Sequence, residues 1–129
     1  MIGFEHKSKR IKTFGLDRIV QVNTLNSTFE LQNEFSREDF FKYAVGITTG
    51  NYKAEKVQIK FSHFASSYIE TKPFHSTQQL IASDNNGKTF EYEIYITPEV
   101  FQKILAWGKE ATVVKPSTFC NEMKNRLNE

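Results

Sequence analysis

The sequence has few of the residues that build covalent or membrane-spanning architecture. It contains one cysteine, Cys120, among 129 residues, and a single thiol can form neither an internal disulfide nor a zinc site made of cysteines. No run of apolar residues approaches the roughly 20 that a membrane-spanning helix needs, and the N-terminal segment has no secretory signal pattern. We therefore expect a cytoplasmic protein that does not bind a membrane.

Residue groupings typical of catalytic centres are missing too. The histidines His6, His63 and His75 fall in separate segments without the spacing of metal ligands. The six glycines are dispersed rather than gathered into a phosphate-binding loop, and neither a serine elbow nor a cysteine–histidine signature occurs. Because an enzyme needs such a constellation in one place, we predict a protein that is not an enzyme, with no catalytic residue, no metal site and no cofactor.

Aromatic residues, in contrast, are abundant. The chain has 12 phenylalanines, and 39% of its residues are hydrophobic. Together with short alternating runs, this composition favours one sheet-containing domain with at most a small appendage. The net charge of +2 is too small for a protein that binds polyanions over its whole surface.

Positive charge is concentrated near the N-terminus. Residues 1–18 carry only two acidic residues, Glu5 and Asp17, against five basic ones, which are Lys7, Lys9, Arg10, Lys12 and Arg18. Such an excess suits contact with phosphate or another anion, although lysines on a solvated edge strand give the same pattern. For Arg18, an ion pair with Asp17 or a neighbouring strand and contact with a ligand are both open.

The first third of the chain predicts strands followed by a short helix. Residues 1–31 have strand-like texture throughout, with a bend at Gly15. Ser36 is a natural N-cap, and the phenylalanines at 35 and 40 occupy the positions of a hydrophobic staple. We expect Gly46 to end this helix and residues 46–54 to form a polar link.

Residues 55–129 predict a second, cleaner pattern. Strands are expected near 57–62, 76–83, 88–97 and 111–115, with helices near 63–72 and 98–108 and a last helix from Ser117. This order is the ferredoxin-like β-α-β-β-α-β arrangement of an α+β fold, with both helices on one sheet face and an extra C-terminal helix. We expect Trp107 to be partly buried against the last strand. The predicted core residues are Val57, Ile59, Phe61, Phe64, Ile69, Phe101, Ile104 and Leu105.

Local signals support these boundaries. "DNNGK" at 84–88 predicts a tight turn between two strands. Thr97-Pro98 is typical of an N-cap and first helical residue, and Gly108 is expected to end that helix. On the first helix of this region, Phe64, Ala65, Tyr68 and Ile69 share one predicted face. On the last helix, the predicted inward residues are Phe119, Cys120, Met123 and Leu127.

Two segments carry a resemblance to a known family. "RIKTFGLDRI" at 10–19 resembles the R-x-F-x-L-D-R-I signature near the end of WYL domains, which occur in bacterial transcription regulators, and "MIGFEH" resembles the strand before it. The remainder, including "KPFHSTQQLI" and "ILAWGKEATVVKP", is similar to the C-terminal extension that follows WYL domains. Lys12 stands where the family usually has arginine, which weakens a bidentate grip on an anion.

The resemblance implies both a function and a division of the chain. WYL domains are small Sm-like β-barrels that bind nucleic-acid or nucleotide-type ligands, and the extension is associated with dimerisation and regulation. We therefore expect residues 1–34 to be the last strands of an incomplete barrel, 35–54 a short helix and linker, and 55–129 the extension domain. The Trp-Tyr pair, the earlier barrel strands and a helix-turn-helix are missing, so the chain resembles the C-terminal part of a longer regulator or a product that starts at an internal methionine.

These observations lead to one predicted function and one alternative. We predict the ligand-sensing and oligomerisation portion of a bacterial WYL-type transcription regulator, with a nucleic-acid or nucleotide-type ligand contacted by Arg10, Lys12 and Arg18. DNA binding is expected only in the context of a longer chain. Because an isolated hairpin has unpaired edges, we predict a homodimer to which residues 1–31 contribute. The alternative is a free-standing ferredoxin-like module that binds a small ligand or a partner protein.

Overall fold

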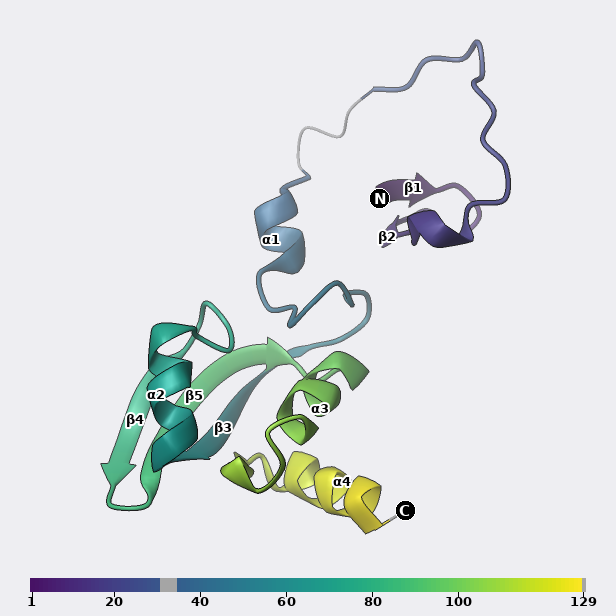
Figure 1. Ribbon diagram of the computed structural model, residues 1–129. Helices are drawn as coiled ribbons and strands as arrows, with labels where there is room; N and C mark the ends of the chain where they lie inside the picture. The colour runs from purple at the N-terminus through teal and green to yellow at the C-terminus, as the bar shows by residue number, and fades with distance from the viewer. Residues whose placement is uncertain (31–34, 129) are drawn as a thin grey trace. The chain divides into compact units, whose positions relative to one another are not determined.

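The computed structural model describes residues 1–30 and 35–128 (Figure 1). The chain divides into two compact units, residues 1–42 and 43–129, and each unit is described by itself. The division falls inside the segment that the sequence predicts to be a helix and linker. The predicted boundary after residue 34 borders positions that lie outside the described residues.

The first unit begins with a β-hairpin. Strands β1 (Ile2–Glu5) and β2 (Arg10–Thr13) pair antiparallel, with Ile2 opposite Thr13 and Glu5 opposite Arg10. The chain then bends at Gly15 into a short 3-10 helix, η1 (Leu16–Arg18). The predicted strands are therefore present up to Thr13, and the predicted bend is present at Gly15.

The strand texture expected beyond that point is wrong as far as residue 30, and its last residue, 31, lies outside the described residues. Residues 19–30 form no strand, and the exposed side chains include Val20 and Val22. A β-branched run adopts a stable strand only where a neighbouring strand accepts its hydrogen bonds. Among the described residues, no strand lies beside this run.

Helix α1 (Arg37–Phe41) confirms the predicted start but not the predicted end. The Ser36 side chain accepts a hydrogen bond from the Asp39 amide at 3.2 Å, and the rings of Phe35 and Phe40 lie 5.5 Å apart. The helix ends five residues before Gly46. It ends early because the next apolar residues, Ala44 and Val45, are buried in the core of the second unit.

The second unit is a four-stranded antiparallel sheet with helices. The strands follow the order β4-β5-β3-β6. Each helical crossover, β3-α2-β4 and β5-α3-β6, therefore joins two parallel strands that have one other strand between them. This is the predicted ferredoxin-like α+β topology with an added C-terminal helix. Figure 1 shows β4, β5 and β3 side by side. In chain order the elements are β3 (Ala54–Ser62), α2 (His63–Thr71), β4 (Gln79–Asp84), β5 (Gly87–Tyr95), α3 (Pro98–Leu105), η2 (Gly108–Glu110), β6 (Ala111–Lys115) and α4 (Ser117–Asn128).

One face of the sheet carries the core. Alternate residues of β3 and β5 are buried there, and all three long helices contribute to the same cluster, so the helices cover this one face. The predicted partial burial of Trp107 is confirmed, and its ring lies 6.0 Å from that of Phe61 on β3. The innermost residues are Val57, Ile59, Phe61, Ala65, Ile69, Phe90, Tyr92, Ile94, Val100, Phe101, Ile104 and Phe119.

The predicted inward face of α2 is partly wrong. Ala65 and Ile69 are buried as expected, but Phe64 is 64% exposed and Tyr68 is also exposed. The helix instead turns Ser66 inward, where its hydroxyl donates to the His63 carbonyl at 2.9 Å. Small residues let the helix approach the sheet closely, so the two large rings are left outside, where they pack on each other at 5.2 Å.

Two further predicted core positions are less buried than expected. Leu105 is only partly buried at the edge of the core, and Leu127 on α4 is 68% exposed. Both residues border a hollow in the surface of this unit rather than a filled interior.

The predicted turn and caps are largely confirmed. Asp84 pairs with Gly87 across the turn that joins β4 and β5, and Thr97 and Pro98 begin α3 as N-cap and first residue. Gly108 adopts the left-handed conformation, with φ +55°, after α3 has ended. No helix in the described part of the chain has the length and apolar character needed to cross a membrane.

Candidate functional site

The hairpin of the first unit separates charged from apolar side chains. Alternation along the strands and the register place Glu5, Arg10 and Lys12 on one face and Phe4 and Ile11 on the other. Lys12 Nζ lies 2.6 Å from Glu5 Oε2. This hydrogen bond holds the pKa of Glu5 below its ordinary value, so Glu5 stays charged and partly neutralises Lys12.

The predicted ligand residues occupy two adjacent elements. Arg10 and Lys12 share a face of β2, and Arg18 follows the bend in η1. The Arg18 side chain is 86% exposed, with its Nε 3.9 Å from Asp17 Oδ2. At that distance in water the ion pair is weak, so Arg18 is available to an external anion. The role of the three residues in binding stays a prediction.

The helix-free face of the second unit is polar. Lys60 Nζ lies 2.6 Å from Asp84 Oδ2, and Glu91 accepts from Gln58 at 2.9 Å and lies 3.3 Å from Lys56. These contacts hold the pKa values of Asp84 and Glu91 below their ordinary values. A face whose charges are paired in this way offers no continuous positive surface to a polyanion.

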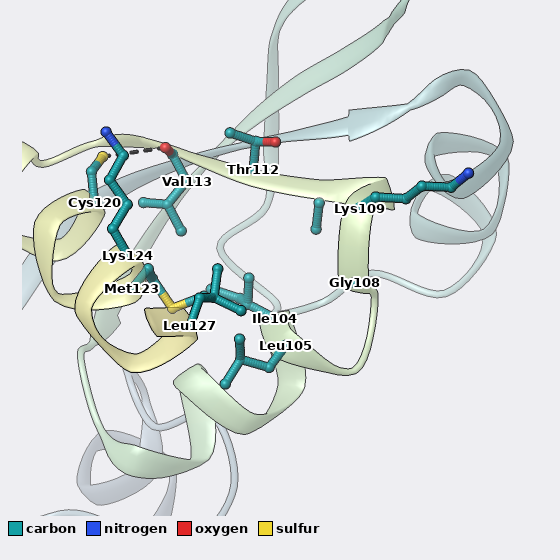
Figure 2. A pocket seen from close by; sticks show the side chains of 11 residues that line it. Ile104, Leu105, Gly108, Lys109, Thr112, Val113, Cys120, Met123, Lys124 and Leu127 are labelled. Carbon is teal, nitrogen blue, oxygen red and sulfur yellow. Dashed lines mark hydrogen bonds between the residues drawn. The ribbon is translucent and has the colours of Figure 1, made fainter. Parts of the chain in front are cut away.

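A hollow of about 440 Å³ opens between the end of α3, β6 and α4 (Figure 2). Ile104 and Leu105 contribute from α3, Val113 from β6, and Met123 and Leu127 from α4. Figure 2 shows Ile104, Leu105, Met123 and Leu127 grouped in one part of this hollow. Its walls are mainly apolar, and its volume lies within the range of small-molecule sites.

Polar groups border the other end of this hollow. The Cys120 thiol donates to the Val113 carbonyl at 3.2 Å, and Lys124 lies one helical turn further along α4. Lys109 also borders the hollow, but Figure 2 shows its side chain extended away from the others. Among the described residues, no three histidine, cysteine or acidic side chains gather as metal ligands here or elsewhere.

Sequence reasoning missed this hollow because it treated the apolar side of α4 as filled core. Phe119 and Met123 are buried as predicted, but Cys120 is only partly buried. One signal was present: Lys124 lies within the stripe that Cys120 and Leu127 define at helical spacing. A cation on an otherwise apolar stripe indicates an opening toward solvent.

The comparisons with known proteins bear on the second unit. The family model of the WCX domain matches residues 53–129, which is more than half of the chain and covers the whole sheet with helices α2 to α4. A search of curated proteins found no match. The WCX domain is the C-terminal extension of WYL-type regulators. This chain belongs to the WCX domain family.

Proposed function

We propose that this chain is the regulatory portion of a bacterial WYL-type transcription regulator, in which it senses a ligand and contributes to oligomerisation. The match of residues 53–129 to the WCX domain carries the proposal. The F-x-L-D-R-I motif at 14–19, which resembles the end of a WYL domain, supports it from the other unit. In this role the protein is not an enzyme and acts in the cytoplasm. Contact with DNA is proposed only for a longer chain that supplies a DNA-binding domain.

The hairpin is the proposed ligand surface. Arg10 and Lys12 lie on its charged face, and Arg18 extends into solvent from the next turn. Arginine suits phosphate because its planar fork can donate two parallel hydrogen bonds. A nucleic-acid or nucleotide-type ligand fits this set of cations, with Arg18 as its principal contact since Lys12 already binds Glu5.

Apolar surface in the same unit supports oligomerisation. On the other hairpin face, Phe4 is 43% exposed, and Phe4, Ile11 and residues 23–25 and 27–30 line a second hollow. Exposed apolar surface of this kind marks interaction sites in proteins, and strand edges invite pairing with another chain. We propose a homodimer to which the segment before α1 contributes, because symmetric dimers are the commonest assemblies.

The test is a titration of the intact chain into a fluorescently labelled single-stranded oligonucleotide, followed by anisotropy over a series of salt concentrations. Arg18→Ala should weaken binding and reduce the magnitude of the slope of log affinity against log salt by about 0.7, the value for one phosphate contact on a single strand. Arg37→Ala removes the same charge from α1, beside Glu38, and should change neither quantity. Unchanged affinity and slope in Arg18→Ala would remove the hairpin from the ligand site.

The alternative is a free-standing ferredoxin-like module that binds a small ligand or a partner protein. The hollow beside α4 is the observation that favours it, because this site lies within the WCX-matched unit and includes none of the hairpin residues. The same titration discriminates: an intact chain that binds neither the oligonucleotide nor a mononucleotide supports the alternative.

A further inference from the structure

The hollow beside α4 is lined mainly by apolar side chains, which suits an apolar ligand. Three elements meet there without filling the space, because Gly108 has no side chain and Ala111 a short one. Leu127 is a large apolar side chain at this site and is 68% exposed. Burial of apolar surface against these walls would stabilise an apolar occupant.

One stripe of α4 adds a cation to this apolar wall. Cys120, Lys124 and Leu127 are spaced at helical intervals on the same side of the helix and all line the hollow. The residues three and four positions from Lys124 include no acid. Glu122, the nearest acid along the described part of α4, is bound by Arg126 at 3.0 Å. No described carboxylate forms an ion pair with Lys124.

We propose that this hollow binds a small amphipathic anion, with its apolar body between α3, β6 and α4 and its negative group at Lys124. The body contacts Ile104, Leu105 and Val113 on one side and Met123 and Leu127 on the other. The anionic group lies at the end of the hollow where the Cys120 thiol meets the Val113 carbonyl. The proposal concerns only the second unit, so it does not rest on the hairpin or on the regulator function.

The chain contains a built-in reporter for this site. Cys120 is the single cysteine, so the mass added by iodoacetamide alkylation measures the accessibility of this one residue in the lining of the hollow. Decanoate supplies a straight apolar body with a carboxylate, and decanol is its uncharged counterpart. We expect decanoate to slow alkylation of the intact chain in a saturable way, and decanol to protect less well.

Two charge variants locate the anionic group. Lys124→Gln should raise the half-protecting concentration of decanoate about fivefold, the effect of one solvent-exposed ion pair, and leave that of decanol unchanged. Lys115→Gln removes the same charge from β6, where Lys115 pairs with Gln58 and acts on Glu91 of the helix-free face. The half-protecting concentration of decanoate should be the same for this control variant as for the unaltered chain.

Several outcomes would overturn the proposal. These are an alkylation rate that decanoate does not change, equal protection by decanol and decanoate, or equal effects of the two lysine variants. Protection that rises with protein concentration in the absence of decanoate would instead assign the hollow to a second copy of the chain. If Cys120 is too slow to alkylate, fluorescence of the single tryptophan, Trp107, which precedes the hollow residue Gly108, gives the same comparison, and an unchanged spectrum overturns it.

Discussion

Thr97 is the N-cap of α3, but its hydroxyl forms no capping hydrogen bond. The residue is fully buried, and its Oγ1 is the one buried side-chain oxygen or nitrogen among the described residues that has no hydrogen-bond partner. An unsatisfied buried hydroxyl costs free energy that an apolar group of the same shape does not. Thr97→Val should therefore leave the free energy of unfolding unchanged or raise it by about 1 kcal/mol.

Urea unfolding of both proteins measures this difference. Thr97→Ala is the matched control, because it removes the hydroxyl together with a methyl group and should destabilise the protein by about 1 kcal/mol through the lost packing. A Thr97→Val protein that is clearly less stable than the unaltered chain would mean that the hydroxyl is bound in the native state.

His75 makes stability depend on pH near neutrality. Burial is the main cause that lowers its pKa below the ordinary value of 6.5. A hydrogen bond with the Ala44 backbone opposes this shift, and the charge of Lys103 adds to it. The ring Nδ1 accepts from the Thr77 amide at 3.2 Å, so the neutral form fits the site. Because the unfolded chain then binds the proton more tightly, the contribution of His75 to stability should be fully present above about pH 6.5 and should decrease as the pH falls below it.

The measurement is the free energy of unfolding between about pH 7 and pH 5. His75→Gln should flatten the pH dependence, and His63→Gln, at an exposed position, should keep it. Asp84 and Glu91 should add little to the change in unfolding free energy between about pH 7 and pH 5, because their pKa values lie below the ordinary 3.8 and 4.5. An identical slope in His75→Gln would assign the pH dependence to another group.

At the scale of elements, the turn between β4 and β5 holds the sheet's register. Gly87 has φ +146°, and a Cβ there would lie 1.9 Å from the Phe61 carbonyl oxygen. Gly87→Ala should thus cost about 3 kcal/mol or more, because backbone strain and a clash add together. Gly50 has φ +116° with nothing within 4 Å of the same position, so Gly50→Ala should cost only the strain, about 1–2 kcal/mol.

Thermal unfolding of the two glycine variants separates strain from contact. Similar midpoints for both proteins would contradict the close approach of β3 and β5 at this turn. A larger loss for Gly87→Ala supports it, provided that circular dichroism shows both variants to be folded.

Elements with one buried and one solvated face could be predicted from the sequence. In β3, Val57 and Ile59 alternate with Gln58 and Lys60, and the structure buries the first pair completely. The strand texture from residue 19 onward could not be judged in this way, because propensity does not say whether a partner strand is present. The predicted burial of Phe64 was wrong for a related reason. Helical spacing shows which residues of α2 share a face, but it leaves open a rotation of the helix by one residue about its axis.

The two candidate sites also differ in whether the sequence could predict them. Arg10, Lys12 and Arg18 could be named from local charge and motif, because they lie within nine residues of one another. The hollow beside α4 could not, because it is formed by α3, β6 and α4 together. Its shape depends on how these three elements pack rather than on any one segment.

For the whole molecule, we expect ligand binding and dimer formation to be linked. A regulatory chain must change its state when its ligand binds, and any ligand that favours the dimer is in turn bound more tightly by the dimer. The apolar hairpin face with Phe4 and Ile11 is the surface proposed for assembly. Ile11→Lys should therefore weaken the dimer without removing the cations of the other face.

The most direct measurement is sedimentation of the intact chain over a range of concentrations, with and without the oligonucleotide used for anisotropy. We expect a homodimer whose dissociation constant falls at least about fivefold when the oligonucleotide is bound, and an Ile11→Lys protein that is shifted toward monomer. A chain that is monomeric at all concentrations, or a dimer whose dissociation constant the oligonucleotide does not change, would contradict this expectation.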